Sequence, residues 1–177
     1  MIEPGLVRPG GDGLITVQKH PRLAPLIEML QTAGFSVQQV PDLSSLIWGK
    51  LVINAAINPL TALLGVPNGK LLQSQSAREL MEEAAREAAQ VATAHGIKLN
   101  FKNPAQAAAA VARATSDNLS SMLQDIHRGA PTEIEVISGA VTRLGREVNI
   151  PTPVNQVLWQ LIQARVELIG NLNHANS

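Results

Sequence analysis

A stripe of polar side chains runs through the otherwise apolar segment from Leu46 to Leu64. The stripe consists of Trp48, Lys50, Asn54 and Asn58, and the last three follow one another at intervals of four residues. In an α-helix each step of four residues returns to within about 40° of the same face. Asparagine is a poor residue inside a helix, and its burial costs free energy unless it is hydrogen-bonded. The segment therefore predicts a core helix with one functional face.

A proline within this segment affects which of the polar residues can act together. Pro59 lacks a backbone donor and crowds the carbonyl oxygen of Ala55, so we expect a bend near Asn58. Lys50 and Asn58 are about 12 Å apart along a straight helix axis, whereas Lys50 and Asn54 are about 6 Å apart and form the better pair. Alternatively, the stem of Lys50 only covers apolar neighbours while its ammonium reaches water.

A second polar cluster follows about seventy residues later, in a similar apolar context. It consists of Ser120, Ser121, Asp125 and Glu133. We expect Glu133 in the first turn of a helix, where the helix dipole favours a carboxylate, so a structural and a functional role explain it equally well. Together the two clusters predict a pocket for a small ligand that is rich in oxygen atoms.

Composition and charge exclude several classes of function. The 14 basic and 14 acidic residues cancel, and neither kind forms a run, so we expect neither nucleic acid nor a membrane surface as a partner. The absence of cysteine excludes disulfides and thiolate catalysis, and the four histidines lack the spacing of metal ligands, so no metal site is predicted. No signal peptide or long apolar span is evident, and we expect a cytoplasmic protein.

Glycine and proline divide the chain into two regions. They punctuate the first forty residues, and the signals after Asp42 are almost entirely helical. We therefore expect a small α/β piece at 1–41 and an all-α domain of five or six helices at 42–177. The expected elements of the first region are two strands at 14–17 and 35–40 and a helix at 25–33. The expected helix caps of the second are Asp42 or Ser44, Ser76 with Glu79, Asn103 before Pro104, Ser116 or Asp117, Thr132 with Glu135, and Thr152 before Pro153.

Four motifs occur in a specific order. They are Trp48-x-Lys50-x-x-x-Asn54-x-x-x-Asn58-Pro59, Ser120-Ser121-Met122-Leu123-Gln124-Asp125, Thr132-Glu133-Ile134-Glu135 and Ile150-Pro151-Thr152-Pro153. This set resembles the C-terminal half of the ketopantoate reductase (2-dehydropantoate 2-reductase) family over about residues 14–170. The resemblance implies a mainly α fold, a multi-helix substrate and dimerisation domain of the 6-phosphogluconate dehydrogenase C-terminal-like type. A short α/β remnant of a Rossmann domain would precede it.

The resemblance also implies a reaction, the NADPH-dependent reduction of a 2-keto acid in the route to pantothenate and coenzyme A. By motif position, Lys50 and Glu133 resemble the family's catalytic residues. The positions that resemble its substrate-binding residues are Asn54, Asn58, Ser121 and Asp125. A positioned ammonium suits the reaction, because hydride addition to a ketone leaves negative charge on oxygen.

The sequence departs from the family where the cofactor should bind. A Rossmann half needs Gly-x-Gly-x-x-Gly between a strand and a helix, and this chain has none, since Gly10-Gly11-Asp12-Gly13 reads as a turn. Ser138-Gly139 also stands where the family commonly has Asn-Gly. We therefore expect the chain neither to bind NADPH tightly nor to reduce ketopantoate without a separate or missing nucleotide-binding half. The alternative is a non-catalytic helical module for dimerisation or for binding a small acid, and self-association is expected in either case.

Overall fold

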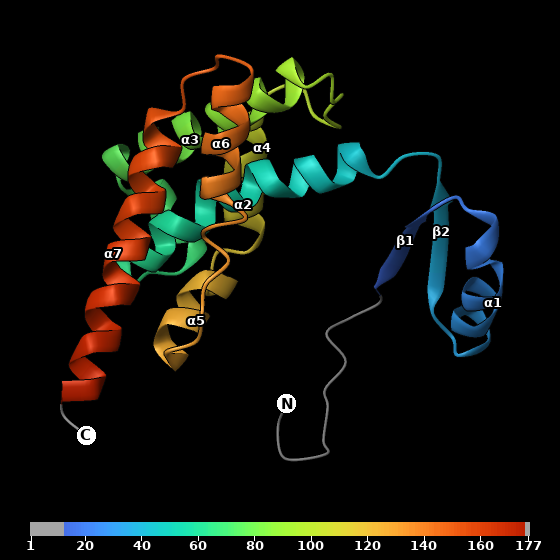
Figure 1. Cartoon of the computed structure of the whole chain (residues 1–177), viewed down its shortest axis with the longest axis horizontal. Coiled ribbons are helices and arrows are strands. Elements are labelled where there is room, and N and C mark those ends of the chain that lie inside the picture. Colours follow the sequence, from blue (N-terminus) through green and yellow to red (C-terminus); the bar gives the residue numbers. More distant parts are fainter. Residues whose placement is uncertain (1–12, 176–177) are drawn as a thin grey trace. The chain divides into compact units, whose positions relative to one another are not determined.

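The computed structural model describes the backbone of residues 13–175 and the side chains of residues 13–168 (Figure 1). The chain forms two compact units that divide between Ser44 and Ser45. Of the expected turn at 10–13, only Gly13 lies within the described residues.

The N-terminal unit is a single β–α–β unit. Strand β1 (Leu14–Gln18) pairs in parallel with β2 (Ser36–Val40), and helix α1 (Ala24–Thr32) connects them after the short 3-10 helix η1 (Pro21–Leu23). Parallel neighbours need such a crossover because a tight turn can join only antiparallel strands. The two strands and the helix expected from the sequence are therefore confirmed, with shifts of one residue at their ends.

The C-terminal unit is helical throughout, which confirms the mainly α class. Its elements are α2 (Ser44–Leu64), the 3-10 helix η2 (Asn68–Gln73), α3 (Gln75–Ala94), α4 (Pro104–Ala114), α5 (Ser121–Arg128), α6 (Ser138–Glu147) and α7 (Pro153–Ala175). Helix α3 packs against α4, α6 and α7. Its inward face is built from alanines such as Ala84, Ala85 and Ala88, all fully buried, and small side chains let the helix axes approach closely.

The C-terminal half of helix α2 belongs to the hydrophobic core of this unit. By length and composition the helix is apolar enough to cross a membrane, but 56% of its most apolar window is buried inside the protein, as in a core helix. The helix continues through Pro59 to Leu64. In its C-terminal half, the Thr61 hydroxyl donates a hydrogen bond of 2.9 Å to the carbonyl oxygen of Ile57, one turn earlier in the helix.

Some of the expected helix caps are confirmed. Asn103 accepts a hydrogen bond from the Gln106 amide at 3.0 Å, with Pro104 as the first residue of α4. Pro153 opens α7, and the carbonyl oxygen of Thr152 accepts from the Gln156 amide at 2.9 Å. These caps depend on residues close in the chain, which is why local sequence reveals them.

Three other expected caps are wrong. Helix α3 begins one residue before Ser76, and Ser74 caps it by accepting from the Ala77 amide at 3.4 Å. Ser120, rather than Ser116 or Asp117, caps α5. Thr132 does not start a helix, because residues 134–137 form a turn and α6 begins only at Ser138. In each region several polar residues compete for the same role, and packing selects among them.

Asp42 holds the start of α2 and should make it sensitive to acid. Its Oδ1 accepts from the Ser44 amide at 2.9 Å and from the Ser44 hydroxyl at 2.7 Å, and these bonds hold the pKa of Asp42 below its ordinary value of 3.8. Because folding lowers this pKa, the ionised Asp42 carboxylate stabilises the folded state at pH values above its unfolded-state pKa. That stabilisation is lost as the pH falls through the folded-state pKa.

We expect the Asp42 carboxyl resonance to titrate with a midpoint below 3.8 in an NMR pH series. The Ser44 amide shift should follow the same curve. In Asp42→Ala the Ser44 amide should lose this titration, and a midpoint at or above the ordinary value would contradict the cap.

Candidate functional site

The polar stripe of α2 goes from exposed to buried along the helix. The Lys50 side chain is exposed, Asn54 is half-buried and Asn58 is only 7% exposed. Trp48 does not share this face, because residues two positions apart in an α-helix point about 160° away from each other. Its ring stacks on His95, with centroids 6.2 Å apart. The stripe therefore consists of one cation at its open end and two amides that lead inward.

The N-terminal end of α5 is joined to the buried end of this stripe. A buried hydrogen bond of 2.7 Å links the Thr61 hydroxyl to the Ser120 hydroxyl, and Thr61 Oγ1 also lies 3.0 Å from the carbonyl oxygen of Asn58. Ser120 caps α5 by accepting from the Leu123 amide at 3.2 Å. Ser121 is therefore the first residue of α5, and it is exposed. The structure thus brings the Asn58 turn of α2 and the start of α5 into one region.

Asp125 and Glu133 follow this region along the chain. Asp125 is half-buried in α5, and its carbonyl oxygen accepts from the Ala130 amide at 2.9 Å where the helix ends. Glu133 is exposed in the segment that leads to α6, five residues before that helix begins. Lys50 and Glu133 form no ion pair with each other. Their convergence on one ligand remains a prediction.

Glu135 anchors the segment that carries Glu133, a role that the sequence did not indicate. Its carboxylate accepts from the Arg143 guanidinium on α6, from Trp159 Nε1 at 2.9 Å and from Gln163 Nε2 at 3.4 Å on α7. Arg143 also lies over the Trp159 ring, 6.0 Å from its centroid. These contacts tie the segment to two helices, so Glu135 limits where Glu133 can lie.

We expect Glu135→Ala to loosen this segment more than it destabilises the protein. The carboxylate is half-exposed, so screening by water limits the loss of stability to about 1 kcal/mol. Amide hydrogen exchange at Val136 and Ile137 should become about tenfold faster, since 1.4 kcal/mol corresponds to a factor of ten. Glu147→Ala, an exposed glutamate on α6, is the matched control. Unchanged exchange at both amides would contradict the anchoring role.

A buried glutamate connects α3 to the start of α7. Glu87 is 3% exposed, and its Oε1 accepts from the Val154 amide at 2.9 Å. Its Oε2 accepts from the Asn155 amide at 2.9 Å and from Asn155 Nδ2 at 2.8 Å. Free amides and the positive end of the helix dipole stabilise a carboxylate there. Glu87 therefore caps α7 from another helix and does not belong to the predicted site.

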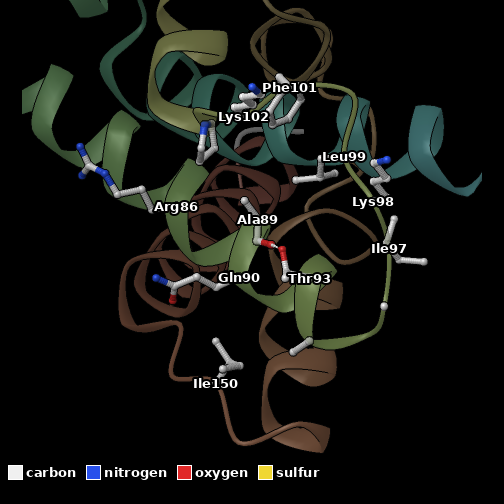
Figure 2. Close-up of a pocket in the computed structure, with 13 residues that line it drawn as sticks. Arg86, Ala89, Gln90, Thr93, Ile97, Lys98, Leu99, Phe101, Lys102 and Ile150 are labelled. Atoms are coloured by element: carbon white, nitrogen blue, oxygen red, sulfur yellow. Dashed lines mark hydrogen bonds between the residues drawn. The ribbon is translucent and has the colours of Figure 1, made fainter.

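A cavity of about 790 Å³ lies beside the C-terminal half of α3 and the segment that follows it (Figure 2). Basic side chains line it, but Arg86 and Lys98 lie on opposite sides of the view and do not converge. Arg86 is also paired with Glu82 and Glu83, each at 2.9 Å. None of the six predicted site residues lines this cavity. It is therefore separate from the α2–α5 region and presents no convergent anion site.

Matches to known proteins show which family the chain belongs to. D-mandelate dehydrogenase, in a ternary structure with NADH and anilino(oxo)acetate, superposes with a TM-score of 0.82 at 23% identity, over 93% of this chain and 70% of that one. At that identity the likeness shows the fold alone. Residues 42–166 match the family described as ketopantoate reductase PanE/ApbA C terminal. The chain belongs to the ketopantoate reductase family and contains its C-terminal domain.

Individual relatives agree with this assignment. A curated 2-dehydropantoate 2-reductase of Pyrobaculum aerophilum is 44% identical over 149 residues, which are 84% of this chain and 53% of the relative. The crystal structure of a PanE/ApbA family ketopantoate reductase from Ralstonia eutropha superposes with a TM-score of 0.84 at 30% identity, over 90% of this chain and 53% of that one. The chain thus spans about half the length of the curated relatives that it matches.

Proposed function

We propose that this chain supplies the substrate-binding and proton-donating half of an NADPH-dependent 2-dehydropantoate 2-reductase, which converts ketopantoate to pantoate. The observation that carries the proposal is the buried Thr61–Ser120 hydrogen bond. It joins the Asn58 turn of α2 to the start of α5, so motifs far apart in the chain meet in one region. The family relatives support the same reaction.

The α2–α5 region suits a small hydroxylated keto acid. The first backbone amides of α5 lack partners within the helix and favour an anion, and the Ser121 hydroxyl adds a donor for the substrate carboxylate. The amides of Asn54 and Asn58 hold neutral oxygen atoms without adding charge. Asp125, half-buried in the same helix as Ser121, completes the proposed substrate-binding set.

Lys50 and Glu133 are the proposed catalytic pair. As the ketone carbon is reduced, its electron pair moves onto oxygen, and the Lys50 ammonium stabilises that charge and donates the proton that completes the hydroxyl. Lysine is then reprotonated from water. Glu133 orients the substrate. Lys50 suits this role because it lies at the exposed end of the stripe, where a donor of hydride can approach.

The described N-terminal unit does not fit a nicotinamide cofactor. The connection from β1 to α1 contains no glycine, and α1 begins at Ala24 after Leu23, which provides no side-chain cap. A dinucleotide site needs glycines there so that the backbone can approach the pyrophosphate. We therefore propose that residues 1–41 are part of a nucleotide-binding domain and that a separate or missing half holds NADPH. We further propose a cytoplasmic homo-oligomer without membrane or nucleic-acid partners.

Reconstitution tests the proposed reaction. The chain is mixed with a separately expressed nucleotide-binding half of a ketopantoate reductase, and NADPH oxidation is followed with ketopantoate as substrate. We expect turnover in the mixture and none with either half alone. If two folded halves that associate give no turnover, the reductase role is wrong. Pantoate binding without turnover would instead favour the non-catalytic module.

A further inference from the structure

Two buried hydroxyls form a continuous chain of hydrogen bonds between α5 and α2. The Leu123 amide donates to Ser120 Oγ at 3.2 Å, and the Ser120 hydroxyl lies 2.7 Å from that of Thr61. Thr61 Oγ1 in turn lies 2.9 Å from the carbonyl oxygen of Ile57. Thr61 is fully buried and Ser120 is only 5% exposed, so the chain of bonds is shielded from water.

The order of donors in this chain of bonds follows from its two ends. A backbone amide can only donate, a backbone carbonyl can only accept, and each hydroxyl has one proton. Every contact is therefore a hydrogen bond when Ser120 donates to Thr61 and Thr61 donates to Ile57. We call this arrangement, from the Leu123 amide to the Ile57 carbonyl oxygen, the hydroxyl bridge. Hydrogen bonds in such a chain polarise one another, so removal of either hydroxyl weakens the whole bridge.

A second set of contacts holds the segment that leads into α5. The Asn68 amide of η2 donates to the Asn118 carbonyl oxygen, and the Gly69 amide donates to the Ser116 carbonyl oxygen, each at 3.0 Å. A Cβ added at Gly69 would lie 2.6 Å from that of Ser116, so the two backbones are closely packed. The fully buried side chain of Leu123 holds α5 itself in the core. Loss of the hydroxyl bridge should therefore loosen only the first turn of α5 and leave the fold intact.

We propose that Thr61 is a positioning residue of the substrate site, a role that rests on the proposed reductase function. Through the hydroxyl bridge it holds the first turn of α5, where Ser121 lies, in a fixed place relative to the α2 turn that carries Asn58. Thr61 Oγ1 lies 3.0 Å from the Asn58 carbonyl oxygen, so one side chain contacts both parts of the site. The donors for the two ends of the keto acid are thus placed before the substrate binds, which lowers the entropy cost of binding.

A positioning role of this kind has a kinetic signature. The substrate carboxylate stays an anion throughout the reaction, so its contacts are alike in the ground state and in the transition state. Loosening the first turn of α5 should therefore raise KM and leave kcat nearly unchanged. If Thr61 only supported the fold, its replacement would lower the fraction of active protein, and with it the apparent kcat, without changing KM.

Two substitutions separate the hydroxyl of Thr61 from its shape. Thr61→Val keeps the shape and removes the hydroxyl, so in the reconstituted enzyme we expect KM for ketopantoate to rise about tenfold, the effect of roughly one lost hydrogen bond. Thr61→Ser keeps the hydroxyl and removes the methyl group, and its KM should stay close to the natural value. Thr93→Val is the matched control, because Thr93 on α3 also bonds the carbonyl oxygen four residues earlier at 2.9 Å but lies outside the site. Its kinetics should equal those of the natural chain.

Amide hydrogen exchange in the whole chain tests the hydroxyl bridge without the reaction. In Thr61→Val the Ser120 hydroxyl loses its acceptor, so the Leu123 amide should exchange about tenfold faster than in the natural chain. In Thr61→Ser and Thr93→Val its exchange should stay at the natural rate. A natural exchange rate of Leu123 in Thr61→Val would overturn the proposal.

The kinetic outcomes separate this inference from the proposed function. Suppose that the natural chain turns over with its nucleotide-binding half while Thr61→Val keeps the natural KM, or that Thr61→Ser raises KM as much as Thr61→Val does. Either result would overturn the positioning role alone. A natural chain that gives no turnover would overturn the reductase function, and the positioning role with it.

Discussion

Replacing Glu87 by alanine is expected to lower the free energy of unfolding by about 4 kcal/mol, the largest effect on stability that we predict. Three hydrogen bonds to its buried carboxylate disappear, and the amides of Val154 and Asn155 lose their acceptor. Asn155 is fully buried, so water cannot replace the missing acceptor without opening the packing. The start of α7 should therefore separate from α3.

Urea denaturation followed by circular dichroism measures this effect. Glu87→Gln keeps the shape but directs an amide nitrogen at a backbone donor, so we expect a loss of about half that size. Glu83→Ala is the matched control, because Glu83 lies on the same helix but is exposed, and its loss should stay within about 0.5 kcal/mol. A Glu87→Ala midpoint equal to that of the natural chain would contradict the capping role.

Lys50→Ala should have the largest effect on activity. In the reconstituted enzyme we expect kcat to fall by a factor of about 10² to 10⁴, the usual contribution of a positioned proton donor, with a smaller change in KM. Because the side chain is exposed at one end of α2, its removal should leave the stability of the chain nearly unchanged. The loss would then report on chemistry rather than on folding.

Two further variants make the Lys50 test specific. Lys50→Arg keeps the positive charge but gives up its proton far less readily, so we expect substrate binding to persist while kcat remains low. Lys98→Ala removes an exposed lysine at the cavity beside α3 and should react like the natural chain. If the Lys50→Ala enzyme turned over at the natural rate, Lys50 could not be the proton donor.

Much of the fold follows from local sequence signals. Asn103 before Pro104 and Thr152 before Pro153 mark helix starts that the structure confirms, because a cap needs only the backbone of the next few residues. The start of α6 follows no such rule. Glu135 was expected in a capping box, but it bonds Arg143, Trp159 and Gln163 instead, and the helix begins at Ser138. Partners on other helices outweigh a local cap.

The candidate site shows the same division. The four-residue spacing of Lys50, Asn54 and Asn58 determined by itself that they share a helix face, since helix geometry is fixed over such short distances. Only the tertiary structure decided that Thr61 bonds Ser120, 59 residues away, and that Glu87 caps a helix start 67 residues away. Those contacts depend on how whole helices pack together, and the spacing of residues along one helix carries no information about it.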